Sequence, residues 1–201
     1  MTFNVNAFRG QLTGDGARAN LFEVALNFPE FASGGSDNAK KATEKTRFMC
    51  KTAQLPGSTL GSVTAQYFGR ELKFAGNRTF ADWTVTIIND EDFLIRNAFE
   101  SWMSGINSHV SNIRNPVANA PLDYTKDGQV YQYGKNGNLI KTYNFVGLFP
   151  TEVSAIDVDW GSNDAIEEFT VTLSYQYWTS NETAGISTGA NAREGAPFST
   201  I

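Results

Sequence analysis

Residues 76–106, GNRTFADWTVTIINDEDFLIRNAFESWMSGI, decide the fold, because a sharply alternating strand is followed almost at once by the only long helical pattern in the chain. In residues 80–89, Trp83, Val85 and Ile87 alternate with threonines, which is the period of two expected when one face of a strand is buried. Tryptophan and β-branched residues suit such a half-buried strand. This stretch therefore predicts a strand that contributes one face to a core.

A helix is predicted over residues 90–106. Asn89 and Asp90 offer side-chain oxygens to the free N–H groups of the first turn, and Glu91 places negative charge where the helix dipole favours it. The apolar residues that follow recur at steps of three and four, which predicts one broad face packed on the sheet. They are Phe93, Ile95, Ala98, Phe99, Trp102, Met103 and Ile106.

Composition indicates one strongly apolar domain. The chain has 201 residues, of which 13% are aromatic and only 18% charged, so part of its surface is expected to lie between subunits. A single cysteine, Cys50, excludes an internal disulfide framework. No apolar run approaches the roughly 18 residues of a membrane span, so no membrane insertion is expected. The net charge of −5 and the absence of a basic patch exclude a protein that binds nucleic acid tightly through its phosphates.

Taken in order, the chain predicts an N-terminal arm (1–20), a β-domain (21–178) with a mobile loop at 29–46, and a C-terminal tail (179–201). The fold class is mainly β, an antiparallel β-sandwich or half-barrel of about eight strands with one flanking helix. A hairpin is indicated by the Asn-Gly turn within 134–137. Strands are predicted at 21–28, 47–54, 62–74 (with a bulge or bend at Gly69), 80–89, 129–133, 139–149 and 165–178.

The residues that could support catalysis do not form a convincing set, so no enzymatic activity, cofactor or metal is expected. The single histidine, His109, lies in a Ser/Asn-rich loop without a neighbouring cysteine, whereas triads and metal sites need several such groups. Glu167 and Glu168 are adjacent in a strand and point to opposite faces. Asp157, Asp159 and Glu168 match the spacing of a calcium loop, but the required glycine is missing and strands flank the loop, which favours a simple turn.

Four stretches resemble the tail tube proteins of contractile-tailed, T-even-like bacteriophages. They are ARANLFEV (17–24), CKTAQLPG (50–57), FAGNRTFADWTVTIINDED (74–92) and FVGLFPTEVSAIDVDWGSNDAIEEFTVTLSYQYW (145–178). The resemblance implies a β-sandwich assembled as hexameric rings that stack into a tube for genome ejection, inside a contractile sheath. Implied partners are the sheath, tape measure, baseplate and tail terminator proteins, and the implied location is the virion, after assembly in the host cytoplasm. Tubes of type VI secretion systems share this fold.

Two sets of residues are then candidates for function. The polar side of the last strand, with the threonines of residues 80–89, is predicted to line the bore, where DNA passes without specific binding; the alternative is that this side faces solvent outside. This set is Thr84, Thr86, Glu168, Thr170, Thr172, Ser174 and Gln176. Ring stacking or contacts between subunits are predicted for Phe3, Val5, Phe8, Leu55, Pro56, Phe68, Arg70 and Leu72.

A different class of function is a monomeric β-sandwich that binds carbohydrate through aromatic residues. Tyr131, Tyr133 and Trp178 are the candidates for that role. Rings or hollow filaments in electron micrographs would distinguish a tube subunit from such a module.

Overall fold

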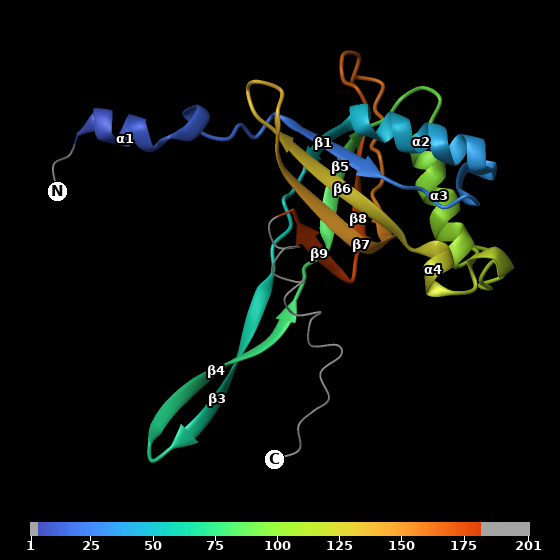
Figure 1. Cartoon of the computed structure of the whole chain (residues 1–201). Helices are drawn as coiled ribbons and strands as arrows, with labels where there is room; N and C mark the ends of the chain where they lie inside the picture. The colour runs from blue at the N-terminus through green and yellow to red at the C-terminus, as the bar shows by residue number, and fades with distance from the viewer. Residues whose placement is uncertain (1–3, 182–201) are drawn as a thin grey trace.

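The computed structural model describes residues 4–181, which form a β-domain with two long projections (Figure 1). The helices are α1 (Val5–Gln11), α2 (Ser36–Met49), α3 (Leu94–Ile106) and α4 (Pro121–Tyr124). Short 3-10 turns lie at Thr13–Asp15, Ala32–Gly34 and Pro116–Ala118. The strands are β1 (Phe22–Leu26), β2 (Cys50–Ala53), β3 (Thr59–Tyr67), β4 (Arg70–Thr79), β5 (Trp83–Ile88), β6 (Lys126–Tyr133), β7 (Leu139–Val153), β8 (Glu168–Ser174) and β9 (Tyr177–Ser180).

One antiparallel sheet carries the fold, in the order β1-β6-β7-β8-β5-β2, with β9 paired to β7 as well. The long strand β7 belongs to both halves of this sheet: residues up to Leu148 pair with β6 or β9, and Phe149 onward pairs with β8. Gly147 lies just before this change of partner strand, and its φ of 72° suits a residue without a Cβ. The sheet therefore bends into a half-barrel, and the predicted mainly β, antiparallel class is confirmed.

The strand predicted from the alternation around Trp83 is confirmed as β5. Trp83, Val85 and Ile87 are buried, whereas the residues between them are half-buried on the other face. β5 pairs with β8 from Trp83↔Leu173 to Ile88↔Glu168, so both strands place their apolar side chains in the same core. The Trp83 ring stacks on Phe145 of β7 with centroids 4.2 Å apart. The hairpin predicted around 134–137 is confirmed as the turn between β6 and β7.

Helix α3 covers the core as expected but begins at Leu94, four residues later than predicted. Phe93 has a left-handed backbone with φ 52°, which interrupts the helix, and Asp92 Oδ1 accepts a hydrogen bond from the Leu94 N–H at 3.0 Å. Asp92 therefore lies in the turn that precedes the helix. The rings of Phe99 and Trp102 on α3 contact Phe28 edge-on, at 4.9 and 5.8 Å, and this cluster fastens the helix to the sheet.

The prediction of a mobile loop at 29–46 was wrong, because most of this segment is helix α2. The buried residues of α2 are Ala39, Ala42 and Thr46, which lie at helical spacing and let the helix approach the sheet closely. Lys45 on α2 makes ion pairs of 2.6 Å with Asp90 and 2.5 Å with Asp92, which join this helix to the turn before α3. The strand predicted at 47–54 is correspondingly shorter, since residues 47–49 end the helix.

The segment predicted as one strand over 62–74 is instead a hairpin. β3 and β4 pair from Thr59↔Thr79 to Tyr67↔Arg70, and the chain reverses at Phe68 and Gly69, both with positive φ. Such a two-residue turn belongs to the type favoured in hairpins. In Figure 1 this hairpin projects far from the body of the molecule.

The two ends of the chain differ from the predicted arm and tail in detail. α1 lies on an extended N-terminal segment away from the sheet (Figure 1). Of the predicted tail at 179–201, Thr179 and Ser180 are part of β9, and residues 182–201 lie outside the described residues. Among the described residues, no helix is long and apolar enough to cross a membrane.

Candidate functional site

The residues predicted to line a bore form a polar stripe on the sheet face opposite the core. Thr84 lies opposite Thr172, and Thr86 lies opposite Thr170, so four threonines from two neighbouring strands stand side by side. All four are half-buried. We use the term polar stripe for these residues together with Glu168 and Ser174. The pairing brings together six of the seven predicted residues, whereas the direction that this face takes in an assembly stays a prediction.

Glu168, at one end of the polar stripe, is the only charged residue of the stripe. The Lys51 Nζ atom lies 2.5 Å from Glu168 Oε1. The positive charge of this lysine on β2 therefore offsets the negative charge of the carboxylate. At the other end, Gln176 falls outside β8, in the bend before β9, and its side chain packs over Gly147. Gln176 therefore does not continue the row of strand side chains. The remaining surface consists of small hydroxyl groups.

The hairpin β3–β4 presents an apolar face that nothing among the described residues covers. Cross-strand pairing places Val63 opposite Phe74 and Ala65 opposite Leu72, with Tyr67 at the outer end. The other face is polar, with pairs such as Thr64↔Lys73 and Gln66↔Glu71. Every residue of β3 is exposed. We call the set Val63, Ala65, Tyr67, Leu72 and Phe74 the hairpin face.

The prediction of a single strand over 62–74 did not show that this segment separates apolar from polar side chains. The turn at residues 68–69 exchanges odd and even positions, so Val63 on β3 shares a face with Leu72 and Phe74 on β4. Val63, Tyr67 and Phe74 were therefore not singled out, although the segment 62–74 as a whole was expected to take part in ring stacking. Reading the segment as two strands around Gly69 would have found them.

The other residues predicted for contacts between subunits lie at three places. Val5 and Phe8 are 72% and 65% exposed on α1, and Phe3 lies outside the described residues. Leu55 and Pro56 belong to the link from β2 into the hairpin. Phe68 is at the hairpin tip with 92% of its surface exposed, and Arg70 begins β4 beside it. These positions occupy the two projections of the molecule and the link into the hairpin.

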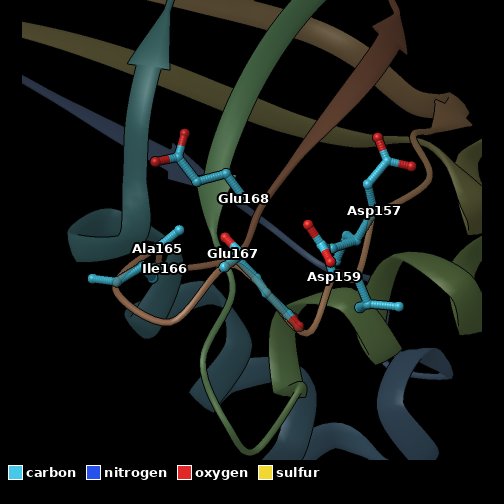
Figure 2. Close-up of a pocket in the computed structure, with 9 residues that line it drawn as sticks. Asp157, Asp159, Ala165, Ile166, Glu167 and Glu168 are labelled. Carbon is cyan, nitrogen blue, oxygen red and sulfur yellow. The ribbon is translucent and has the colours of Figure 1, made fainter.

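The groups considered for chemistry are not arranged for it. His109 lies in the loop after α3, where the Ser111 backbone N–H donates a hydrogen bond to Ser108 Oγ at 3.4 Å. Burial raises the pKa of the Cys50 thiol to about 12, so it is a poor nucleophile. In the part of the chain that the structure describes, no three His, Cys, Asp or Glu side chains could hold one metal ion. Figure 2 shows Asp157 and Glu168 on opposite sides of an open hollow.

The aromatic residues of the carbohydrate-binding alternative do not form one surface. Tyr131 pairs with Thr142, whereas Trp178 pairs with Phe145 three residues further along β7, so the two rings lie on opposite faces of the sheet. Their polar atoms are also engaged inside the chain. Tyr133 donates a hydrogen bond to Glu23 at 2.9 Å, and the Trp178 indole donates one to the Gly57 carbonyl at 3.1 Å.

Comparison with known proteins gives a consistent result. A family model described as phage tail tube protein matches residues 17–181. The chain is 33% identical over 167 residues to tail tube protein gp19 of Enterobacteria phage T4, which covers 83% of this chain and 93% of gp19. It is 31% identical over 176 residues to a tail tube protein of Serratia phage KSP90, covering 85% and 93% of the two chains.

Among solved structures, the fold is similar to that of the anti-feeding prophage cap, described as the AFP tube terminating cap. The TM-score is 0.58 at 16% identity, over 82% of this chain and 90% of the other. At that identity the likeness concerns the fold alone. The match to the family model and the identity to two tail tube proteins concern most of the sequence. The chain belongs to the phage tail tube protein family.

Proposed function

We propose that this protein is the structural subunit of a phage tail tube, in which copies form hexameric rings that stack into a conduit for the genome. Its place is the virion, after assembly in the host cytoplasm, and its partners besides itself are the sheath, tape measure, baseplate and tail terminator proteins. Family membership supports the tube. No reaction, cofactor or metal is part of this function.

The observation that carries the proposal is the hairpin face. A two-stranded hairpin with no third strand is marginally stable in water. Here β3 and β4 form their own sheet, and Val63, Tyr67 and Phe74 are 59%, 64% and 56% exposed. A contiguous apolar surface of this kind marks an interaction site. Another subunit is the partner that a tube supplies, so the hairpin face is proposed to contact a neighbouring copy.

The N-terminal segment supports the same function. Val5 and Phe8 share one side of α1 at a spacing of three residues, and α1 has no buried residue. Since a short helix gains most of its stability from packing, α1 is expected to settle on a neighbouring subunit. Leu55 and Pro56, which lead into the hairpin, are assigned to the same contacts between subunits.

The polar stripe is proposed to line the bore. Its four central residues are threonines, and its single carboxylate is bound to Lys51. Each phosphate held by a lysine or arginine adds affinity, which would slow the passage of DNA. A wall of neutral hydroxyl groups lets the genome pass without specific binding. Gln176, which follows Ser174 outside the strand, is kept as a bore residue in this proposal.

Electron microscopy of the purified protein tests the proposal directly. A tube subunit gives rings or hollow filaments whose abundance rises with protein concentration. Analytical ultracentrifugation of the same samples measures how much protein remains as single chains. A protein that stays monomeric at millimolar concentration and binds a sugar in calorimetry would refute the tube function in favour of a carbohydrate-binding module.

A further inference from the structure

A second exposed apolar patch lies in the connection from β7 to β8, at residues 156–167, which we call the acidic loop. Val158 and Ile166 are 81% and 70% exposed, and the Trp160 side chain is as exposed as in an extended peptide. The loop also carries Asp157, Asp159, Asp164 and Glu167 and has no lysine or arginine. A fully exposed tryptophan in a short loop is a strong candidate for a contact residue, because tryptophan is enriched among the residues that dominate binding energy.

The acidic loop contains a closed turn at Asp159 and is anchored at its end by Asn89. Asp159 accepts a hydrogen bond from the Gly161 N–H at 3.0 Å. At the end of the loop, the Asn89 backbone N–H donates to the Glu167 carbonyl at 2.8 Å, and the Asn89 side chain donates to the Glu167 carboxylate at 2.8 Å. Trp160 therefore lies in a turn that is closed by a hydrogen bond, which lowers the cost of ordering the loop when a partner docks on it.

The hairpin and the acidic loop lie at opposite ends of the sheet. β4 leads into the start of β5 at Trp83, whereas the acidic loop leads into β8 at Glu168, which pairs with Ile88 at the far end of β5. The length of β5 separates the two, about 17 Å at roughly 3.4 Å per residue. Figure 1 shows the hairpin projecting from the lower end and the orange β7–β8 connection at the top.

The hairpin is complementary to the acidic loop in chemistry. Residues 59–79 carry Arg70, Lys73 and Arg78 against one acid, Glu71, a net charge of +2. Arg70 begins β4 opposite Tyr67, on the side of the hairpin face. The acidic loop contributes four carboxylates around three apolar side chains, a net charge of −4. Opposite charges surrounding apolar patches favour association and fix its register.

The tip of the hairpin has a conformation that suits a contact. Phe68 has φ 46°, a left-handed backbone that is rare for a bulky residue, and its ring stands against Tyr67 with centroids 4.5 Å apart. Residues held in such sparsely populated conformations cluster at binding sites. The turn thus presents Phe68 outward, with Arg70 beside it.

We propose that the hairpin tip of one copy docks on the acidic loop of the next copy, which joins successive rings of the tube. Phe68 and Tyr67 lie against Trp160 and Ile166, and Arg70 lies among the carboxylates of the loop. An open hollow of about 260 Å³, lined in part by Asp157, Val158 and Ile166, receives the tip (Figure 2). Because the two surfaces differ and lie at opposite ends, the contact propagates from copy to copy. This inference depends on the proposed tube function.

Replacing the exposed tryptophan tests the apolar part of the contact. Trp160→Ala should leave the thermal unfolding of the monomer and the formation of single rings unchanged, and raise the protein concentration at which filaments appear by about tenfold or more. Leu122→Ala is the matched control, since Leu122 is 85% exposed but lies on α4. It should leave the filament concentration unchanged. Equal filament formation by Trp160→Ala and Leu122→Ala would overturn the docking site.

A charge exchange tests the identity of the partner. Arg70→Glu and Asp157→Arg should each weaken stacking, because each variant brings like charges together at every interface. The chain with both changes restores the attraction and should stack better than either single variant. If the double variant instead loses filament formation by the sum of the two single effects, the hairpin and the loop do not meet.

The same measurements distinguish this inference from the function on which it depends. If the unaltered protein forms filaments and the variants behave like it, the tube function stands and the docking site is refuted. If the unaltered protein forms neither rings nor filaments, the tube function fails and this inference fails with it.

Discussion

The hairpin face offers the most direct test of assembly, by substitution of Val63, Leu72 and Phe74 with threonine. These side chains are 59%, 42% and 56% exposed in the single subunit, so an interface can still remove about half of each from water. Burying a whole side chain of this kind contributes about 1.5–3 kcal/mol, so half-burial contributes about 1 kcal/mol each and roughly 3 kcal/mol together. Since about 1.4 kcal/mol corresponds to a factor of ten, stacking should weaken roughly a hundredfold.

The subunit itself should be unaffected by this triple substitution. The three residues are exposed and lie on a two-stranded sheet that is separate from the main sheet, and threonine keeps the β-propensity of the positions. Circular dichroism should give the same unfolding midpoint in urea. Sedimentation velocity and negative-stain micrographs should show rings or single chains at concentrations where the unaltered protein forms filaments.

A matched control uses the opposite face of the same two strands. Gln66, Glu71 and Lys73 are replaced with threonine in one chain, which changes the same number of exposed hairpin residues. Filaments should persist, with at most a change in their salt dependence. Filaments formed by the Val63, Leu72 and Phe74 variant at the original concentration would refute the reasoning that this face is buried by a neighbouring subunit.

Four further changes test other parts of the molecule. Phe99→Ala removes a ring with no exposed surface from the centre of the α3 contact, and should cost about 3–5 kcal/mol in urea unfolding of the subunit. Thr172→Arg places a cation in the polar stripe and should slow genome release from assembled virions without changing tube length; release at the normal rate would contradict the bore assignment. Deletion of residues 1–15 should leave the unfolding midpoint intact and prevent filament formation, and filaments of normal length would contradict it. Hydrogen bonds from Lys45 lower the pKa values of Asp90 and Asp92. The stability that these ion pairs contribute is therefore fully present above the ordinary carboxyl pKa of about 4, and it is lost as the pH falls through the lowered pKa values. Lys45→Met should therefore be less stable than the unaltered chain at pH 7, and the difference in unfolding midpoint should shrink at low pH.

The parts of the fold with strong periodicity could be predicted from the sequence. β5 and the aromatic face of α3 follow directly from residues such as Trp83, Val85 and Phe99. Large apolar side chains at a fixed spacing must all be buried on one face, and this determines both the type of element and the face that packs on the core. The polar stripe follows from the same alternation. Its formation across two strands needed the register that places Thr84 opposite Thr172, which the pattern alone does not specify.

The parts that could not be predicted depend on small residues or on special backbone geometry. α2 packs through Ala39, Ala42 and Thr46, which give almost no apolar signal although alanine is the best helix former. The hairpin was read as one strand because Phe68 occupies a left-handed position that sequence rules assign to glycine or asparagine. Trp160 lies in a turn without periodicity, so its exposure is known only from the structure.

The projection of the hairpin into water has a consequence for surplus subunits. A chain outside a tube offers host proteases the aromatic and basic residues of an isolated turn, Phe68 and Arg70, whereas docking would shield the same bonds. Cleavage at the turn would destroy the surface needed for incorporation. Turnover of unused copies and resistance of finished tails to digestion can thus arise from one short loop.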